Sequence, residues 1–229
     1  MDSLLHAALD ERILRACDRA KRSRGEITLV AVTKTHTVET CLKAYALGLR
    51  DFGENRAQEL LQKQPHLPKD IRWHFIGHLQ SNKVNQVAPI ATLIHSVDAL
   101  STAIALSKRA EVLDRKIEAL IEINISGESQ KHGIPQEQAS AFVGSIIAEA
   151  KNIELRGLMG VASNETDIER TRPQFAALRA LRSIIALEHQ DLRRFDQLSM
   201  GMSHDFEVAI EEGATIIRIG SALFGARPA

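Results

Sequence analysis

Apolar runs rich in β-branched residues alternate with stretches of helical periodicity along most of the chain. These runs cover residues 27–33, 49–53, 71–76, 91–97, 117–123, 153–159, 195–200 and 214–219. Several of them are almost entirely apolar, which is typical of strands that are buried on both faces of a parallel sheet. The pattern therefore predicts about eight parallel strands.

Between these runs, apolar residues recur three and four positions apart, as on one face of a helix. The face that follows Pro135, a residue suited to a first helical turn, carries Ala139, Phe142, Val143, Ile146, Ile147 and Ala150. A second such face precedes the first strand and carries Leu5, Ala8, Leu9, Ile13, Ala16, Cys17 and Ala20. We expect this extra N-terminal helix to cover one end of the fold.

Alternating strands and helices allow either a doubly wound open sheet or a closed barrel. Eight repeats within 229 residues favour the barrel. No G-x-G-x-x-G motif follows the first strand, which weakens the dinucleotide-binding alternative. Because the chain shows no long linker and no low-complexity segment, the sequence predicts an α/β fold with a single domain over residues 1–229. That domain is a (β/α)₈ TIM barrel with an extra N-terminal helix.

Charge and cysteine content narrow the setting in which the protein works. The 29 Lys and Arg residues balance the 29 Asp and Glu residues, and no dense basic run is present, so we expect no nucleic-acid partner. Cys17 and Cys41 form no CxxC pair, which suits a reduced cytosol. The start of the chain is charged throughout, and no stretch of about 18 apolar residues occurs. We therefore expect a cytoplasmic protein without a membrane partner.

Functional side chains of a parallel barrel lie at the C-terminal ends of its strands. The loops after strands seven and eight of such barrels often bind phosphate through backbone N–H groups and a helix N-terminus. In this chain those loops hold Gly201 and Gly220, where the backbone could approach an anion closely. Ser199 and Ser221 add hydroxyl donors to the same loops. Ser203 resembles a cap for a helix that starts near residue 206.

Lys34 directly follows the first strand, and closure of the barrel would bring it beside strand eight. A lysine in an apolar barrel mouth loses charge stabilisation, so its amine can attack an aldehyde and form an imine. A phosphate site, an aldehyde and a lysine together point to pyridoxal 5′-phosphate (PLP). In the simpler alternative, Lys34 is a surface lysine, the glycine-serine loops are turns and Arg218 neutralises a carboxylate inside the barrel.

Three histidines also raise a metal hypothesis. His74, His78 and His95 lie in or next to predicted strands. No H-E-x-x-H motif is present, and positions along a strand alternate between its two faces. We therefore expect no metal site from this set.

Several motifs, in order, resemble the YggS/PROSC family of PLP homeostasis proteins. They occupy residues 31–35, 52–55, 73–83, 95–98, 198–203 and 218–225. The resemblance runs from the first strand to the C-terminus. It implies an alanine racemase N-terminal-like barrel that holds PLP as an internal aldimine, a Schiff base, on Lys34.

The resemblance also implies roles for single residues. It places Asn55 near the cofactor ring, Arg218 at the pyridine nitrogen, and four residues at the phosphate: Ser199, Gly201, Gly220 and Ser221. The chain departs from the family pattern at two positions. Thr33 replaces the usual serine but keeps a hydroxyl, and Thr37 occupies a site that is often proline.

Two classes of function then compete. A cationic Arg218 at the pyridine nitrogen would disfavour protonation of the ring and so weaken it as an electron sink for a carbanion. The related racemases add a β-domain that supplies a tyrosine across a dimer, whereas the only tyrosine here, Tyr45, follows strand one. We therefore expect a monomeric, non-catalytic protein that carries, buffers or delivers PLP in intracellular vitamin B6 homeostasis, with recipient apo-enzymes as partners. An amino-acid racemase and a class I aldolase-type enzyme are the alternatives.

Overall fold

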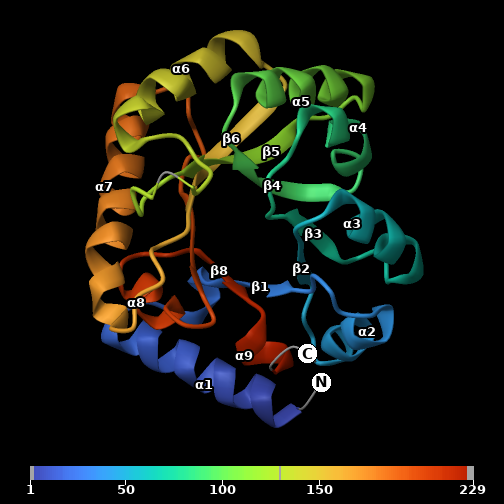
Figure 1. Cartoon of the computed structure of the whole chain (residues 1–229), viewed down its shortest axis with the longest axis vertical. Helices are drawn as coiled ribbons and strands as arrows, with labels where there is room; N and C mark the ends of the chain where they lie inside the picture. The colour runs from blue at the N-terminus through green and yellow to red at the C-terminus, as the bar shows by residue number, and fades with distance from the viewer. Residues whose placement is uncertain (1–2, 129, 226–229) are drawn as a thin grey trace.

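A computed structural model describes residues 3–128 and 130–225. Within them, eight parallel strands close into one barrel in chain order, with β1 beside β8 (Figure 1). The strands are β1 Thr28–Val32, β2 Asp51–Glu54, β3 Arg72–Phe75, β4 Ala91–Val97, β5 Ile117–Ile123, β6 Ile153–Gly160, β7 Gln197–Met202 and β8 Ile216–Ile219. Each overlaps one predicted run, so the predicted α/β TIM barrel is confirmed. That residues 1–229 make a single domain stays a prediction.

A helix follows every strand, and these helices form the outer layer of the barrel (Figure 1). They are α2 Val38–Ala46, α3 Ala57–Lys63, α4 Val84–Val87, α5 Leu100–Val112, α6 Ala139–Glu149, α7 Arg172–Glu188, α8 Phe206–Glu211 and α9 Ser221–Phe224. Short 3₁₀ turns occupy Arg24–Glu26, Gln64–His66, Ser81–Lys83, Gln136–Gln138 and Ile168–Thr171. No helix in the described part of the chain is both long and apolar enough to span a membrane.

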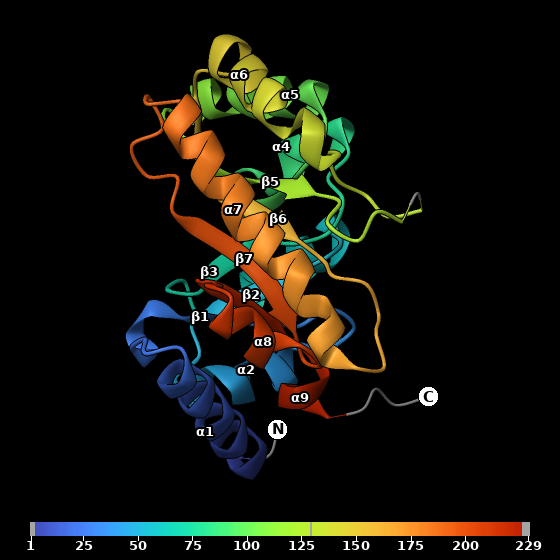
Figure 2. The same ribbon diagram turned by 90° about the vertical axis from the view of Figure 1, so that its left-hand side faces the viewer.

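The extra N-terminal helix is α1, Ser3–Arg19. Leu9, Ile13, Ala16 and Cys17 of its predicted apolar face are buried, whereas Leu5 and Ala8 are exposed. The helix packs beside α8 and α9 rather than across an end of the barrel (Figures 1 and 2). The Arg12 guanidinium lies 4.7 Å from the centre of the Phe206 ring, and its Nε donates to Glu207 Oε1 at 2.8 Å. The predicted position was therefore wrong, because the sequence pattern reveals a buried face but not the element that covers it.

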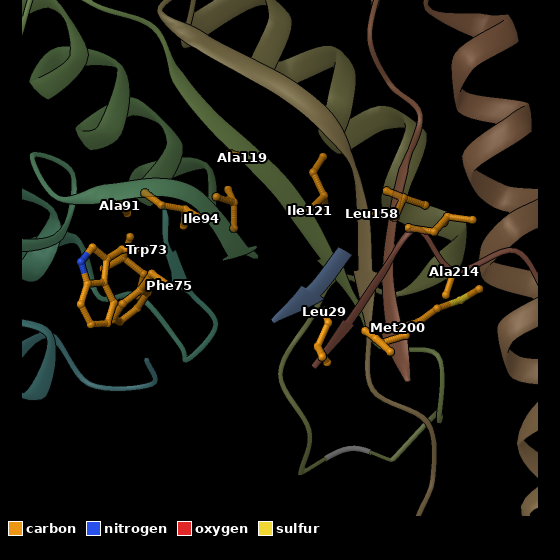
Figure 3. Close-up of a cluster of buried hydrophobic side chains, with 14 of the residues drawn as sticks. Leu29, Trp73, Phe75, Ala91, Ile94, Ala119, Ile121, Leu158, Met200 and Ala214 are labelled. Atoms are coloured by element: carbon orange, nitrogen blue, oxygen red, sulfur yellow. The ribbon is translucent and has the colours of Figure 1, made fainter. Parts of the chain in front are cut away.

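Strand alternation divides the core into two layers. Outward-facing side chains pack beneath the helices, and Figure 3 labels ten residues of this layer, among them Trp73, Ile94 and Met200. Inward-facing apolar side chains form a separate cluster inside the barrel, which consists of Val30, Leu93, Leu120, Met159 and Ile216. The barrel interior is therefore packed rather than open, and its chemistry is confined to the remaining inward positions and the mouth.

Candidate functional site

Lys34 begins the turn that follows β1, and α3 fixes this turn from both sides. Thr35 takes a φ of +67°, a region that β-branched residues rarely enter. Its N–H donates to Glu59 Oε2 at 2.7 Å. On the other side of the lysine, Lys63 Nζ donates to the carbonyl oxygen of Thr33 at 2.7 Å. The strained turn therefore presents Lys34 at the barrel mouth in a defined position.

A buried ion pair lies directly behind this turn. Lys63 Nζ is 2.6 Å from Glu54 Oε1 and 3.2 Å from Glu59 Oε2. The Thr33 hydroxyl donates to the same Glu54 oxygen at 2.7 Å. Burial raises the pKa of Glu54 in spite of these contacts. Three oxygen atoms, including the Thr33 carbonyl, thus occupy the three donors of the Lys63 ammonium, which makes Lys63 a structural cation and not a second nucleophile.

The structure brings Lys34 next to the loop that follows β8, as closure of the barrel predicted. A small void of about 30 Å³ is lined by Val32, Lys34, His36, Gly220, Ser221 and Gly225. The His36 ring packs against Phe224 of α9, with ring centres 4.5 Å apart. The void is small, so little open space lies beside Lys34 in this structure.

Backbone donors at the start of α9 converge on one oxygen atom. The N–H groups of Gly220 and Ala222 both donate to Ser203 Oγ at 3.2 Å. Ser203 was predicted to cap the helix near residue 206, and that prediction was wrong, because the N-cap of α8 is Asp205. Asp205 Oδ1 instead accepts from the N–H of Met202 at 2.6 Å. Ser203 was not predicted as a site residue, although it ends the motif at residues 198–203.

The two predicted phosphate glycines differ in what they require. Gly201 has a φ of +92°, and a Cβ there would lie 2.6 Å from the Cβ of Ala209. This glycine is therefore needed for the close packing of α8 on β7. A Cβ on Gly220 would only meet Val32 at 3.7 Å, an ordinary contact, so its surroundings leave space above the backbone.

The two predicted phosphate serines point to different places. Ser221 is exposed and lines the small void beside Lys34. Ser199 is fully buried inside the barrel, where its hydroxyl lies 2.8 Å from His95 Nδ1 and 2.6 Å from Arg218 NH1. The structure thus separates Ser199 from the loop around Gly220 and joins it to Arg218.

Arg218 extends from β8 across the interior towards β6. One guanidinium nitrogen donates to the carbonyl oxygen of Ser199 at 2.7 Å, and the other donates to that of Gly160 at 3.0 Å. Burial lowers the pKa of Arg218 to about 10, while Glu122 and Asp205 act against this shift. Its direct partners in the described residues are neutral oxygens, which differs from the simpler expectation that it pairs with a carboxylate.

A line of hydrogen bonds continues from Ser199 towards the opposite end of the barrel. His95 Nε2 lies 2.9 Å from His74 Nδ1, and His74 Nε2 lies 3.0 Å from Asp51 Oδ1. Burial lowers the pKa of His95 well below its ordinary value, so its ring is neutral. We call Asp51, His74, His95, Ser199 and Arg218 the polar line.

The proton positions along the polar line follow from its ends. Because Arg218 can only donate, the Ser199 hydroxyl accepts from it and is free to donate to His95 Nδ1. His95 then donates from Nε2 to His74, and His74 donates from Nε2 to the Asp51 carboxylate. In this arrangement every donor points from Arg218 towards Asp51, and the neutral His95 is the Nε2–H tautomer.

Asn55 follows β2 and is only partly exposed. Its buried Oδ1 has no hydrogen-bond partner among the described residues. A Cβ on Gly77 would lie 2.1 Å from the carbonyl oxygen of Asn55, so the close approach of these two segments requires glycine. A buried acceptor without a donor is uncommon, and a ligand hydroxyl could supply the missing hydrogen bond.

A further hollow of about 250 Å³ lies at the ends of β5 and β6. It is lined by Glu122, Ile123, Asn124, Gln130, Lys131, His132 and Val161. Burial, followed by the nearby charge of Asp98, raises the pKa of Glu122 to about 7. Glu122 was not predicted as a site residue, although a carboxylate near the C-terminal end of the strand run 117–123 was a signal. A pKa near neutrality suits a group that exchanges protons.

The three histidines weighed as a metal set do not act as one group. His74 and His95 contact each other inside the barrel, whereas His78 Nδ1 lies 3.2 Å from Asp98 Oδ2 at the mouth. A larger hollow of about 540 Å³ lies where β5 and β6 begin, with Lys116, Ile153 and Arg194 in its lining. It contains no predicted site residue, and it lies at the end of the barrel opposite Lys34.

The alanine racemase N-terminal domain family matches residues 6–228. The pyridoxal phosphate homeostasis protein of Aquifex aeolicus is 43% identical over 218 residues, which cover 95% of this chain and 94% of that protein. The chain belongs to the pyridoxal phosphate homeostasis protein family. The resemblance inferred from the sequence motifs is thereby confirmed.

Solved structures of other members and relatives share the barrel of this family. PipY of Synechococcus elongatus PCC7942, solved with PLP bound, is 33% identical with a TM-score of 0.81, covering 93% of this chain and 100% of PipY. Alanine racemase of Clostridium difficile 630 is 14% identical with a TM-score of 0.69, covering 96% of this chain and 57% of the racemase. The second likeness concerns the fold alone.

Proposed function

We propose that this protein binds PLP through Lys34 and carries, buffers or delivers it within the cell as part of vitamin B6 homeostasis. The observation that carries the proposal is the position of Lys34 beside two backbone donors of α9, those of Gly220 and Ala222, which converge on one oxygen atom. An amine next to an oxygen-binding cradle matches a ligand that joins an aldehyde to a phosphate.

The residues present fit PLP at three places. PLP supplies an aldehyde that reacts with an amine, a phosphate group and a pyridine ring with a hydroxyl substituent. In the proposal, Lys34 takes the aldehyde, while Gly220, Ser221 and Ser203 hold the phosphate. The unpartnered Oδ1 of Asn55 accepts from the ring hydroxyl. Gly201 acts by shaping β7 against α8, and Ser199 acts by holding Arg218.

Arg218 favours a carrier over an enzyme. With a pKa of about 10 it is a cation at neutral pH, and its hydrogen bonds to Ser199 and Gly160 fix it in the interior. At the pyridine nitrogen, this charge would oppose protonation of the ring. Tyr45, the tyrosine weighed as a base, donates to the carboxylate of Asp70 at 2.8 Å on the surface. We therefore propose that the protein is monomeric and non-catalytic, and that it passes PLP to apo-enzymes.

One observation favours a second function, slow amino-acid racemisation. The pKa of Glu122 is raised to about 7, mainly by burial, and its carboxyl group lies close enough to Arg218 to influence it. A positioned acid or base of this kind contributes roughly 10²–10⁴-fold to a proton transfer. Racemisation would thus need Glu122, whereas binding and delivery of PLP would not.

The first test concerns attachment at Lys34. PLP-loaded protein is reduced with borohydride, and peptide mapping should find the pyridoxyl group on Lys34. Lys34→Ala should lose the near-visible absorbance completely, while the exposed control Lys43→Ala, which removes an ion pair with Glu39, should keep it. A pyridoxyl group found on Lys63 and never on Lys34 would refute the proposed attachment.

The second test separates a carrier from an enzyme. PLP-loaded protein is incubated with L-alanine in D₂O, and the Cα proton is followed by NMR. A carrier gives no catalytic exchange, whereas Lys34-dependent exchange near roughly 1 s⁻¹, abolished in Glu122→Gln, supports the racemase. Delivery is measured separately, as activity regained by an apo-enzyme mixed with the loaded protein. A loaded protein that never restores activity contradicts the carrier role.

A further inference from the structure

Three side chains from three consecutive loops meet at the rim of the barrel mouth. His78 follows β3, Asp98 follows β4, and His132 lies in the loop after β5. Nδ1 of His78 is 3.2 Å from Asp98 Oδ2, and Nδ1 of His132 is 3.9 Å from the same oxygen. We propose that this triad, His78, Asp98 and His132, binds a divalent transition-metal ion such as Zn²⁺.

The chemistry of the triad matches that class of ion. Two imidazole nitrogens and one carboxylate oxygen form a ligand set used for zinc and non-haem iron, whereas Mg²⁺ and Ca²⁺ prefer oxygen ligands alone. The three candidate ligand atoms all lie within 4.8 Å of one another. With three protein ligands, a tetrahedral ion keeps one position for water or a bound molecule.

The three ligand spacings require adjustments of different size, because the ligand atoms lie up to 4.8 Å apart. Bonds of about 2.0–2.2 Å to a tetrahedral ion place two ligand atoms roughly 3.4 Å apart. The 3.2 Å spacing between His78 and Asp98 already fits this, and the 3.9 Å spacing to His132 needs about half an ångström. The two imidazole rings stack at 4.3 Å with an interplanar angle of 13°, so one ring must tilt. His132 can do so, because its side chain is 60% exposed.

Asp98 gives the triad a fixed anchor. Its side chain is only 8% exposed, and its Oδ1 has no hydrogen-bond partner among the described residues. Buried carboxylate oxygens normally have partners, so this one has unused capacity to accept a positive charge. Lys131, which precedes His132 in the sequence, is engaged elsewhere: its Nζ lies 2.5 Å from Glu128 Oε1 and donates to the carbonyl of Ala162 at 3.1 Å.

An ion at the triad would link the loop after β5 to the ends of β3 and β4. That loop also lines the hollow next to Glu122, because His132 belongs to both. The triad contains no residue proposed to hold PLP, so metal binding at the triad does not depend on PLP binding at Lys34.

The test uses tag-free protein without PLP, because polyhistidine tags and free PLP both bind metals. Titration with Zn²⁺ by calorimetry should give one site, and Co²⁺ should give the visible absorbance of a nitrogen- and oxygen-ligated ion. His132→Ala should weaken binding at least about tenfold, the lower limit for loss of even an outer-shell partner. The control His66→Ala removes another exposed histidine and should leave binding unchanged.

Asp98→Asn adds a nearly isosteric variant that removes the charge of the anchor. Since Asp98 is buried and its variant could lose stability, His132→Ala is the decisive comparison. Lys34→Ala should bind the ion as well as the unaltered chain, so a failure of the PLP proposal leaves the metal result readable. Absence of one-to-one binding, or equal loss of affinity in His132→Ala and His66→Ala, overturns the proposal.

Discussion

Inward-facing positions of this barrel carry two clusters of opposite character. Val30, Leu93, Leu120, Met159 and Ile216 form the apolar interior cluster, and the polar line runs beside it from Asp51 to Arg218. The two share strands and levels: Leu93 and His95 both belong to β4, and Met159 is the register partner of Ser199. Polarity at these positions is therefore not imposed by the strand or by the depth in the barrel.

The two clusters stabilise the barrel in different ways. The apolar cluster contributes through burial, at roughly 25 cal/mol for each Å² removed from water. Burial of the polar line costs the hydration free energy of its groups, and hydrogen bonds offset this cost only if every member finds a partner. Its charges lie at the ends, on Arg218 and on Asp51, which also accepts from Arg72 Nε at 2.7 Å. The hydrogen bonds between them, through His74, His95 and Ser199, give Arg218 a fixed orientation, which an apolar interior could not provide.

The largest expected effect is that of Arg218→Met, which tests the polar line at its charged end. The change leaves the Ser199 hydroxyl and the Ser199 and Gly160 carbonyls without their donor, and it removes the cation near Glu122. We expect the free energy of unfolding to fall by about 3–5 kcal/mol in urea titrations without PLP. A loss below about 1 kcal/mol, or no greater than that of the exposed control Arg194→Met, would show that the line does not depend on Arg218.

Leu120→Ala tests the apolar cluster in the same interior. Leu120 is fully buried, and its truncation leaves a cavity between strands. We expect a loss of about 2–5 kcal/mol in the free energy of unfolding. The affinity for PLP, measured by absorbance titration, should stay within about twofold, because Leu120 belongs to the apolar interior cluster, which includes no proposed site residue. A large loss of affinity at full folding would show that the two clusters are not functionally separate.

The sequence was sufficient for the barrel but only partly for its site. Eight apolar runs located eight strands, because burial on both faces leaves a continuous pattern that needs no tertiary information. Lys34 could be placed beside strand eight because, when eight strands close into a barrel in chain order, the first strand pairs with the last. Partners within the site had no such pattern: Ser199 and Ser203 occur in one short segment, yet Ser199 faces the interior and Ser203 meets α9.

Groups joined across the barrel were the hardest to predict. His95 and Ser199 are 104 positions apart, and no local signal connects them. Only the three-dimensional register decides which inward positions meet. The same limit explains the metal hypothesis: the sequence grouped His78 with His74 and His95, whereas the fold places it with Asp98 and His132. Residue type suggested the chemistry, but the partners came from the closure of the barrel.

Glu122→Gln tests a third kind of inward position through the pH dependence of stability. Glu122 is an inward carboxylate that belongs neither to the apolar interior cluster nor to the polar line. Its folded pKa is raised to about 7, mainly by burial, from an ordinary value near 4.5. The stabilising contribution of the protonated form is therefore complete below about pH 4.5 and is lost as the pH rises towards 7. The variant should lose this dependence and gain about 1–3 kcal/mol relative to the unaltered chain between pH 4.5 and 8. The exposed control Glu149→Gln should show no such gain, and parallel pH profiles of both variants would contradict the assignment.

The smallest expected effect comes from a double-mutant cycle on His74 and His95. Either His74→Leu or His95→Leu leaves a buried nitrogen or hydroxyl without its partner, which costs about 1–3 kcal/mol. The double variant removes both ends of their 2.9 Å contact, so it should be less destabilised than the sum of the two changes by about 1 kcal/mol at pH 8.

The same variants also test the pH dependence of stability. Burial lowers the pKa of His95 in the folded state, so the contribution of His95 to the free energy of unfolding is full above about pH 6.5 and is lost as the pH falls below it. Variants that contain His95→Leu should therefore lose less stability than the unaltered chain between pH 8 and 5.5. Strict additivity at pH 8 would mean that the two rings pack as neighbours without sharing a hydrogen bond, and the one-directional chain of donors that orients Arg218 would then be broken at its centre.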